Sequence, residues 1–243
     1  MIYFVLFILF LVFMPHSAYA WGPGVHIGVS INILDKLNPQ TASMLLANLN
    51  EYLYGSLAPD FVIGKKYSKD KRHTHNWDIG FDILNSSTTD SQKAFALGYL
   101  THLAADAAAH GILIPSLTQE EKHKNVKHFY IETLADIYCD NSYKSLAKRV
   151  LKRYNKKLDV QFKFKVDSVL FSFSVSKALF RGMSKITFNR KFERVMLNRY
   201  FIRYCSVQAE FIKGYIELSE RFAIDVADKL NDSEVVKISA ISR

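Results

Sequence analysis

The sequence predicts an all-α protein, a multi-helix single domain. Only 10 glycines and 5 prolines occur in 243 residues. Apolar residues recur at three- and four-residue spacing over long stretches, which is the pattern of amphipathic helices. No Gly/Ser/Pro-rich linker, low-complexity tract or internal repeat divides the chain, so we expect one domain.

The pattern allows the helices to be placed. They are expected at residues 24–36, 40–54, 91–110, 118–138, 142–155, 167–182 and 190–229. Thr118 and Glu121 have the spacing of a capping box, so Thr118 is expected to begin its helix. Residues 160–166 alternate polar and apolar side chains as a strand does, but one isolated strand cannot form a sheet. The all-α expectation therefore stands.

Residues 1–20 have the features of a secretory signal peptide. Residues 1–14 carry no charged side chain, and Ala18-Tyr19-Ala20 fits the small-residue cleavage pattern. The apolar run is shorter than the ~20 residues that a membrane-spanning helix needs, although the usual Lys or Arg ahead of it is absent. We expect cleavage before Trp21, giving an exported protein that is periplasmic or secreted.

The positive charge belongs to the C-terminal half. The net charge is +9, and residues 141–243 contain 22 Lys and Arg against 10 Asp and Glu, whereas residues 1–140 contain 10 against 13. A basic helical surface suits an anionic membrane, a phosphate-bearing substrate or nucleic acid. Ordinary solvated helix faces explain individual lysines equally well.

The two cysteines, Cys139 and Cys205, lie far apart and have no C-x-x-C spacing. A thiolate zinc site or a redox motif is therefore not expected. In an oxidising compartment the two residues would either form one disulfide or remain free thiols.

Histidines and carboxylates with regular spacing indicate a metal site. On a helix through residues 98–110, side chains four apart share one stripe, which here carries His102, Asp106 and His110 with alanines between them. His128 and Glu132 repeat the spacing on a second expected helix. Two such helices face to face can hold more than one divalent ion. Imidazole and carboxylate ligands suit zinc, and also iron or manganese.

The remaining candidates complete an ordered set along the chain. The set comprises Trp21-Gly22, His26, Asp60, His75-Asn76-Trp77-Asp78, His102-x-x-x-Asp106, His110 and His128-x-x-x-Glu132. Over residues 21–132, this set resembles the zinc-dependent phospholipase C family and its relatives, the single-strand-specific zinc nucleases. The resemblance implies the all-helical fold of that family.

The resemblance also implies three zinc ions and their ligands. The first ion would be held by the α-amine and carbonyl of Trp21 with His26 and Asp106, the second by His75, His102, Asp106 and Asp60, and the third by His110, His128 and Glu132. A free α-amine at Trp21 requires removal of the signal peptide, because only an unblocked, unprotonated amine can bind a metal.

The implied reaction is hydrolysis of a phosphodiester bond. Attack by zinc-bound hydroxide would convert a phospholipid into diacylglycerol and a phosphorylated headgroup, with Asp60 and Asp106 as the catalytic residues. A phospholipid or an anionic membrane surface is the expected partner, and no protein partner is expected. Nucleic acid or another phosphodiester is the alternative substrate. A non-catalytic, metal-stabilised module that binds membranes is the third hypothesis.

Two positions depart from the family pattern. Asp106 and His110 are four residues apart, a closer spacing than in well-known members, and Gly111 is expected to end the helix and restore the reach of His110. His73 is an alternative to His75, but His75 fits the His-x-x-Asp pattern better. Residues 141–243 match no motif.

Overall fold

The computed structural model describes residues 21–62, 73–118, 124–153, 155–163, 165–166, 172–197 and 209–241. The expected signal peptide lies outside these residues. Every regular element in the described ranges is helical, which confirms the all-α prediction. None of the helices in these ranges is both long and apolar enough to cross a bilayer.

The first half of the chain supplies the helices that carry the candidate ligands. They are α2 (Pro23–Asn32), α3 (Pro39–Ala47), α4 (Leu49–Gly55), η1 (Ala58–Phe61), α5 (Trp77–Asn85), α6 (Asp90–Ala108), the π-helical turn η3 (Ala109–Leu113), α7 (Ile114–Thr118) and α8 (Lys124–Tyr138). The second half adds α9 (Asn141–Lys152), α10 (Lys156–Lys163), α11 (Phe173–Thr187), α12 (Arg190–Met196), α14 (Ala209–Lys229), η4 (Leu230–Asp232) and η5 (Glu234–Lys237).

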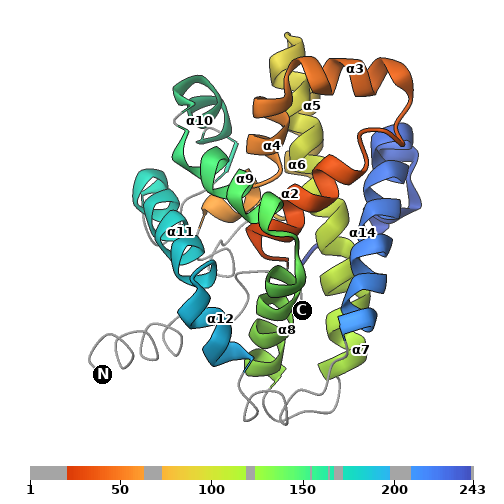
Figure 1. Cartoon of the computed structure of the whole chain (residues 1–243). Helices are drawn as coiled ribbons and strands as arrows, with labels where there is room; N and C mark the ends of the chain where they lie inside the picture. Colours follow the sequence, from red (N-terminus) through yellow and green to blue (C-terminus); the bar gives the residue numbers. More distant parts are fainter. Residues whose placement is uncertain are drawn as a thin grey trace.

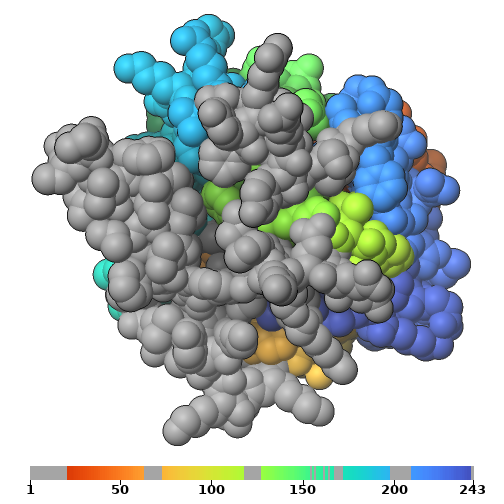
Figure 2. All heavy atoms as spheres, turned by 90° about the horizontal axis from the view of Figure 1, so that it is seen from below, coloured from red at the N-terminus to blue at the C-terminus, as the bar shows by residue number. Residues whose placement is uncertain are grey.

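Helix α6 is the centre of the molecule. Every residue from Ala94 to Ala108 is buried, so this helix has no solvent-facing stripe. It packs most extensively against α14 and α4, and also against α5 and α2. In Figure 1, α8, α11 and α12 lie on the side away from α3 and α5. Helix α7 lies beside α14, where it reaches the surface seen in Figure 2.

Two glycines allow α4 and α6 to touch through their backbones. A Cβ atom added at Gly98 would lie 1.9 Å from the carbonyl oxygen of Tyr52, and one at Gly55 would lie 2.0 Å from that of Phe95. Both distances are far below van der Waals contact. The end of α4 is therefore held directly against α6, one turn before His102.

Several local expectations are wrong. Within 160–166, Val160 to Lys163 belong to α10 instead of a strand, because Leu158 and Phe162 are buried four residues apart while Val160 is exposed. Thr118 is the last residue of α7 and so does not begin a helix; its expected partner Glu121 lies outside the described residues.

The expected helix at 190–229 is interrupted. Helix α12 ends at Met196 with a turn at Leu197, and α14 begins at Ala209. Helix α5 was not expected at all, because its nine residues are too short to show a clear period. Its first turn is capped by the Asn76 side chain, which accepts a hydrogen bond from the backbone N–H of Asp78 at 3.0 Å.

We predict that Gly98→Ala lowers the free energy of unfolding by about 1–3 kcal/mol, because the added methyl must push α4 away from α6. Gly182→Ala is the matched control, since an added Cβ there meets no atom within 4 Å. It should stabilise helix α11 by about 0.5–1 kcal/mol. Urea unfolding of both variants checks this, and equal stability of the two would contradict the backbone contact.

Candidate metal centre

Four side chains from three segments of the chain, two of them on α6, converge at one point. The Nε2 atoms of His75 and His102 lie 3.1 Å apart. The Oδ2 atom of Asp106 lies 3.0 Å from the first and 3.2 Å from the second. The Oδ1 atom of Asp60, from η1, lies 3.4 Å from His75 Nε2 and 3.9 Å from His102 Nε2. All four side chains are buried.

The Nδ1 atoms of His102 and His75 each have a polar neighbour outside the centre. The Nδ1 atom of His102 lies 2.9 Å from the carbonyl oxygen of Ser56. Because that oxygen only accepts, Nδ1 carries the hydrogen and Nε2 presents a lone pair to the centre. The Nδ1 atom of His75 lies 3.2 Å from Thr74 Oγ1, a hydroxyl that can accept or donate and so is compatible with the same tautomer. With both rings in this tautomer, two lone pairs would face each other 3.1 Å apart, and a metal ion between them would satisfy both.

The other oxygen of Asp106 faces a second histidine. Asp106 Oδ1 lies 3.3 Å from His26 Nε2, and the His26 ring stacks on His102 with centroids 3.8 Å apart. Neither ring nitrogen of His26 and neither oxygen of Asp106 has hydrogen-bond geometry to a described residue. Buried polar atoms that approach one another without hydrogen bonds require an explanation such as an ion, so the donor set fits a metal.

Burial and charge set the protonation states that ligands need. Burial, with His102 next to it, lowers the pKa of His26 from 6.5 to about 3. Burial by itself would raise the pKa of Asp106, but His102, His75 and His26 outweigh it and hold this pKa well below its usual range. At neutral pH the imidazole is therefore neutral and the carboxylate charged, which are the metal-binding forms.

A third group lies between the end of α6 and α8. His128 Nε2 is 2.6 Å from Glu132 Oε1, and the rings of His110 and His128 meet edge to face with centroids 5.0 Å apart. Burial raises the pKa of Glu132 to about 8, although His128 acts in the opposite direction. Desolvation of this kind is offset when a cation occupies the site.

The π-helical turn η3 brings His110 to this group. Gly111 does not end the helix as expected, because the helical backbone continues through Ala109–Leu113 into α7. A π-turn inserts an extra residue and changes the direction of the side chains that follow. Gly111 also allows close approach of the C-terminal segment, since a Cβ there would lie 2.3 Å from Ile238 Cγ2.

The ligand atoms of each group lie within 4.8 Å of one another, so three groups could each hold a metal ion. They are His26 with His102 and Asp106, Asp60 with His75 and His102, and His110 with His128 and Glu132. These eight residues are the predicted side-chain ligands, and their occupation by metal remains a prediction. The predicted alternative His73 is not in these groups, and Asp78 is exposed in the first turn of α5.

Trp21, the ninth predicted ligand, is held beside Asp106 through its indole. Its side chain is fully buried, and Nε1 donates to the carbonyl oxygen of Ala105 at 3.1 Å and to Ser219 Oγ at 2.9 Å. Ser219 comes from α14, in the half of the chain that matched no motif. Sequence reasoning missed this residue because a lone buried serine has no distinguishing pattern.

Sequence reasoning also missed Asp136, although a signal was present. Asp136 lies four residues after Glu132 and eight after His128, so it continues their stripe along α8. Its carboxylate is buried and accepts a hydrogen bond from the backbone N–H of Val25 at 3.0 Å. Of the two cysteines, Cys139 is a free thiol, and Cys205 lies outside the described residues.

Groups of buried histidines and carboxylates inside a helical core are typical of metal-binding proteins of the bundle-core type. The chain matches the family described as zinc dependent phospholipase C over residues 25–182. It belongs to this zinc-dependent, phospholipase C-like family, whose His and Asp clusters here could bind metal.

A curated relative adds a partial match. An uncharacterized protein of Archaeoglobus fulgidus is 34% identical over 98 residues, which are 38% of this chain and 26% of the relative. The match thus spans about a quarter of the relative's length. No solved structure matches the chain.

We predict that zinc stabilises the metal-free protein, by about 2.7 kcal/mol when free zinc is 100 times its dissociation constant. Asp106→Asn should lose most of this stabilisation, since the carboxylate is shared by two groups. Asp90→Asn, an exposed change at the start of the same helix, should keep it. Thermal unfolding with and without zinc and chelator measures the effect, and an unchanged melting temperature of the wild type would contradict the site.

Proposed function

We propose that this protein is an exported zinc-dependent phospholipase C that hydrolyses phospholipids to diacylglycerol and a phosphorylated headgroup. The observation that carries the proposal is the division of the Asp106 carboxylate, with Oδ1 facing His26 and Oδ2 facing His75 and His102. A carboxylate that faces ligands on both sides is suited to bridge two ions.

Bound zinc supplies a Lewis acid that activates water at neutral pH and neutralises the charge of a phosphate group. The protein supplies the geometry. The Ser56 carbonyl fixes the His102 ring, and Asp106 balances the charge of the centre. The Asp60 carboxylate lies 3.4 Å from His75 Nε2. From there it can accept a proton from an attacking water and orient that water. We therefore assign Asp60 and Asp106 as the catalytic residues.

We further propose that three zinc ions bind and that export activates the protein. Three groups of ligand atoms support the number. Trp21 is anchored beside Asp106 by its indole, which supports a position for its backbone near the His26 group. Cleavage after Ala20 would free the α-amine of Trp21 as an additional ligand. Export to the periplasm or medium and activation would then be one event.

A lipid substrate is favoured over a nucleic acid by the proposed export, while the basic charge is compatible with both. An exported protein with a basic C-terminal half is well placed to approach an anionic membrane, where each nearby Lys or Arg contributes roughly 1 kcal/mol. The metal chemistry itself suits any accessible phosphodiester.

The role of the amino terminus can be tested by extending it. We predict that a mature protein retaining one extra residue ahead of Trp21 loses one zinc ion and most of its activity, because the α-amine is moved away. An extension at the other end of the chain is the control. Elemental analysis and turnover are measured, and full zinc content in the extended form would show that the amine is not a ligand.

The substrate can be tested on one preparation with two assays. We predict release of phosphorylated headgroup from phospholipid vesicles, faster on mildly anionic ones, and little cleavage of single-stranded DNA or RNA. Asp60→Asn should keep most of its zinc yet lose about 10²–10⁴-fold in turnover, the usual range for a general base. Hydrolysis of single strands with inert phospholipid would favour a nuclease. Inactivity on both with zinc bound would favour the membrane-binding module.

A further inference from the structure

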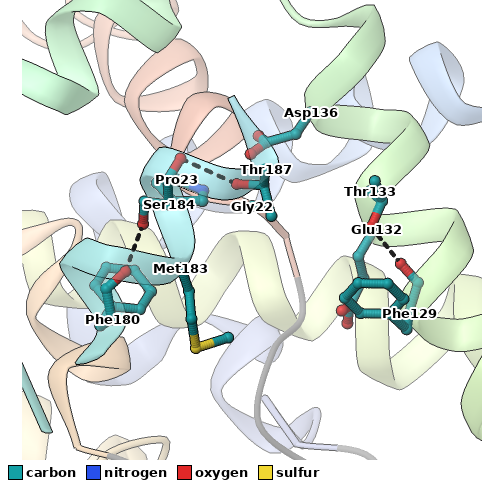
Figure 3. Close-up of a pocket in the computed structure, with 10 residues that line it drawn as sticks. All are labelled: Gly22, Pro23, Phe129, Glu132, Thr133, Asp136, Phe180, Met183, Ser184 and Thr187. Atoms are coloured by element: carbon teal, nitrogen blue, oxygen red, sulfur yellow. Dashed lines mark hydrogen bonds between the residues drawn. The ribbon is translucent and has the colours of Figure 1, made fainter. Parts of the chain in front are cut away.

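Asp136 connects the start of the described chain to the helix that carries His128 and Glu132. The carboxylate projects from α8 toward Gly22 and Pro23, at the edge of the pocket between α8 and α11 (Figure 3). Its Oδ1 accepts from the backbone N–H of Val25 at 3.0 Å. Helix α2 begins at Pro23, and its N-cap residue Gly22 has no side chain to satisfy the first backbone N–H groups. Asp136 therefore caps α2 from another helix.

The contact leaves no room for a side chain at Gly22 and little at Gly24. A Cβ added at Gly22 would lie 2.2 Å from Cγ and from Oδ2 of Asp136, and one at Gly24 would lie 2.9 Å from Oδ1. The backbone of residues 22–25 therefore lies directly on the carboxylate. Such a contact fixes the chain on both sides, because Trp21 precedes it and His26 follows one turn later, with its N–H bonded to the Gly22 carbonyl.

The environment of Asp136 gives it few alternative partners. The side chain is 4% exposed, and burial raises its pKa to about 7 even though the Val25 N–H and Lys144 act in the opposite direction. Lys144 directs its ammonium group to the Ile137 carbonyl at 3.1 Å and to Glu193 at 3.0 Å. Burying a carboxylate is costly unless it accepts hydrogen bonds, and the backbone N–H of Val25 donates one to Asp136.

We propose that Asp136 is a positioning residue of the metal centre, which holds the backbone of Trp21 and Gly22 in register with His26 so that the processed amino terminus reaches the ion shared with Asp106. This inference rests on the proposed function of the Trp21 amine. Trp21 precedes α2 and belongs to no helix, so the Asp136 carboxylate on α8 would be what places its amine. The carboxylate itself does not touch the substrate.

Zinc stoichiometry and affinity of the processed protein test the proposal. Asp136→Ala should lose one zinc ion or bind it about 10–100-fold more weakly, the range found for residues that orient metal ligands. Gly22→Ala should have the same effect with the carboxylate intact, because the added methyl displaces the chain. Asp136→Asn keeps one acceptor oxygen for Val25, and should retain more zinc than Asp136→Ala.

Asp140→Ala is the matched control. Asp140 caps α9 through the backbone N–H of Ser142 at 2.6 Å and is exposed, so its loss weakens a helix cap without touching α2. The metal-free form of this variant should lose thermal stability while its zinc content stays that of the wild type. If the role of Asp136 were purely structural, Asp136→Ala would likewise lose thermal stability and keep the zinc content of the wild type.

A double variant decides which ion is affected. His26→Ala removes a ligand of the same ion, so Asp136→Ala added to it should cause no further loss of zinc. Elemental analysis and competition with a chromophoric chelator are the measurements. Full zinc content in both Asp136→Ala and Gly22→Ala, or additive losses in the double variant, would overturn the proposal while leaving the proposed function standing. A wild type that binds no zinc would overturn both.

Discussion

The burial of a charged carboxylate in the middle of α6 is the constraint on which the rest of the structure depends. Asp106 is fully buried, and an uncompensated charge at such a position would prevent folding. His26, His75 and His102 surround it at 3.0–3.3 Å. Because these residues come from α2, the segment before α5, and α6, satisfying one carboxylate requires three parts of the chain to be assembled around it.

The surrounding helices can be understood as supports for that assembly. Gly55 and Gly98 bring α4 against α6, which places the Ser56 carbonyl on the His102 ring. The opposite side of α6 is covered by α14, whose Ser219 holds the Trp21 indole beside Ala105. The close contact with α4 thus fixes the orientation of the His102 ring. The hydrogen bonds from α14 fix the residue that precedes α2. Contacts of this kind commonly orient metal ligands from behind.

The third group shows how a short spacing in sequence is accommodated. A regular α-helix would have kept His110 in line with Asp106, whereas the π-turn at Ala109–Leu113 redirects it toward His128 and Glu132 on α8. The same helix α8 carries Asp136 one turn further on, so both the third group and the start of α2 are connected to one element. A change in the position of α8 would therefore move both the third group and the start of α2.

The sequence by itself determined the helical class and eight side chains that the structure brings together, because helical periodicity and the order of His, Asp and Glu are local and readable along the chain. It did not determine the π-turn at His110, the interruption after Met196, or the end of α7 at Thr118, since these depend on packing against distant helices. Nor could it assign Ser56, Ser219 or Asp136, whose roles arise from carbonyl, hydroxyl and carboxylate contacts across 46 to 198 positions of sequence separation. Only the tertiary structure decides such contacts, because a single backbone carbonyl or serine has no pattern until another helix is placed beside it.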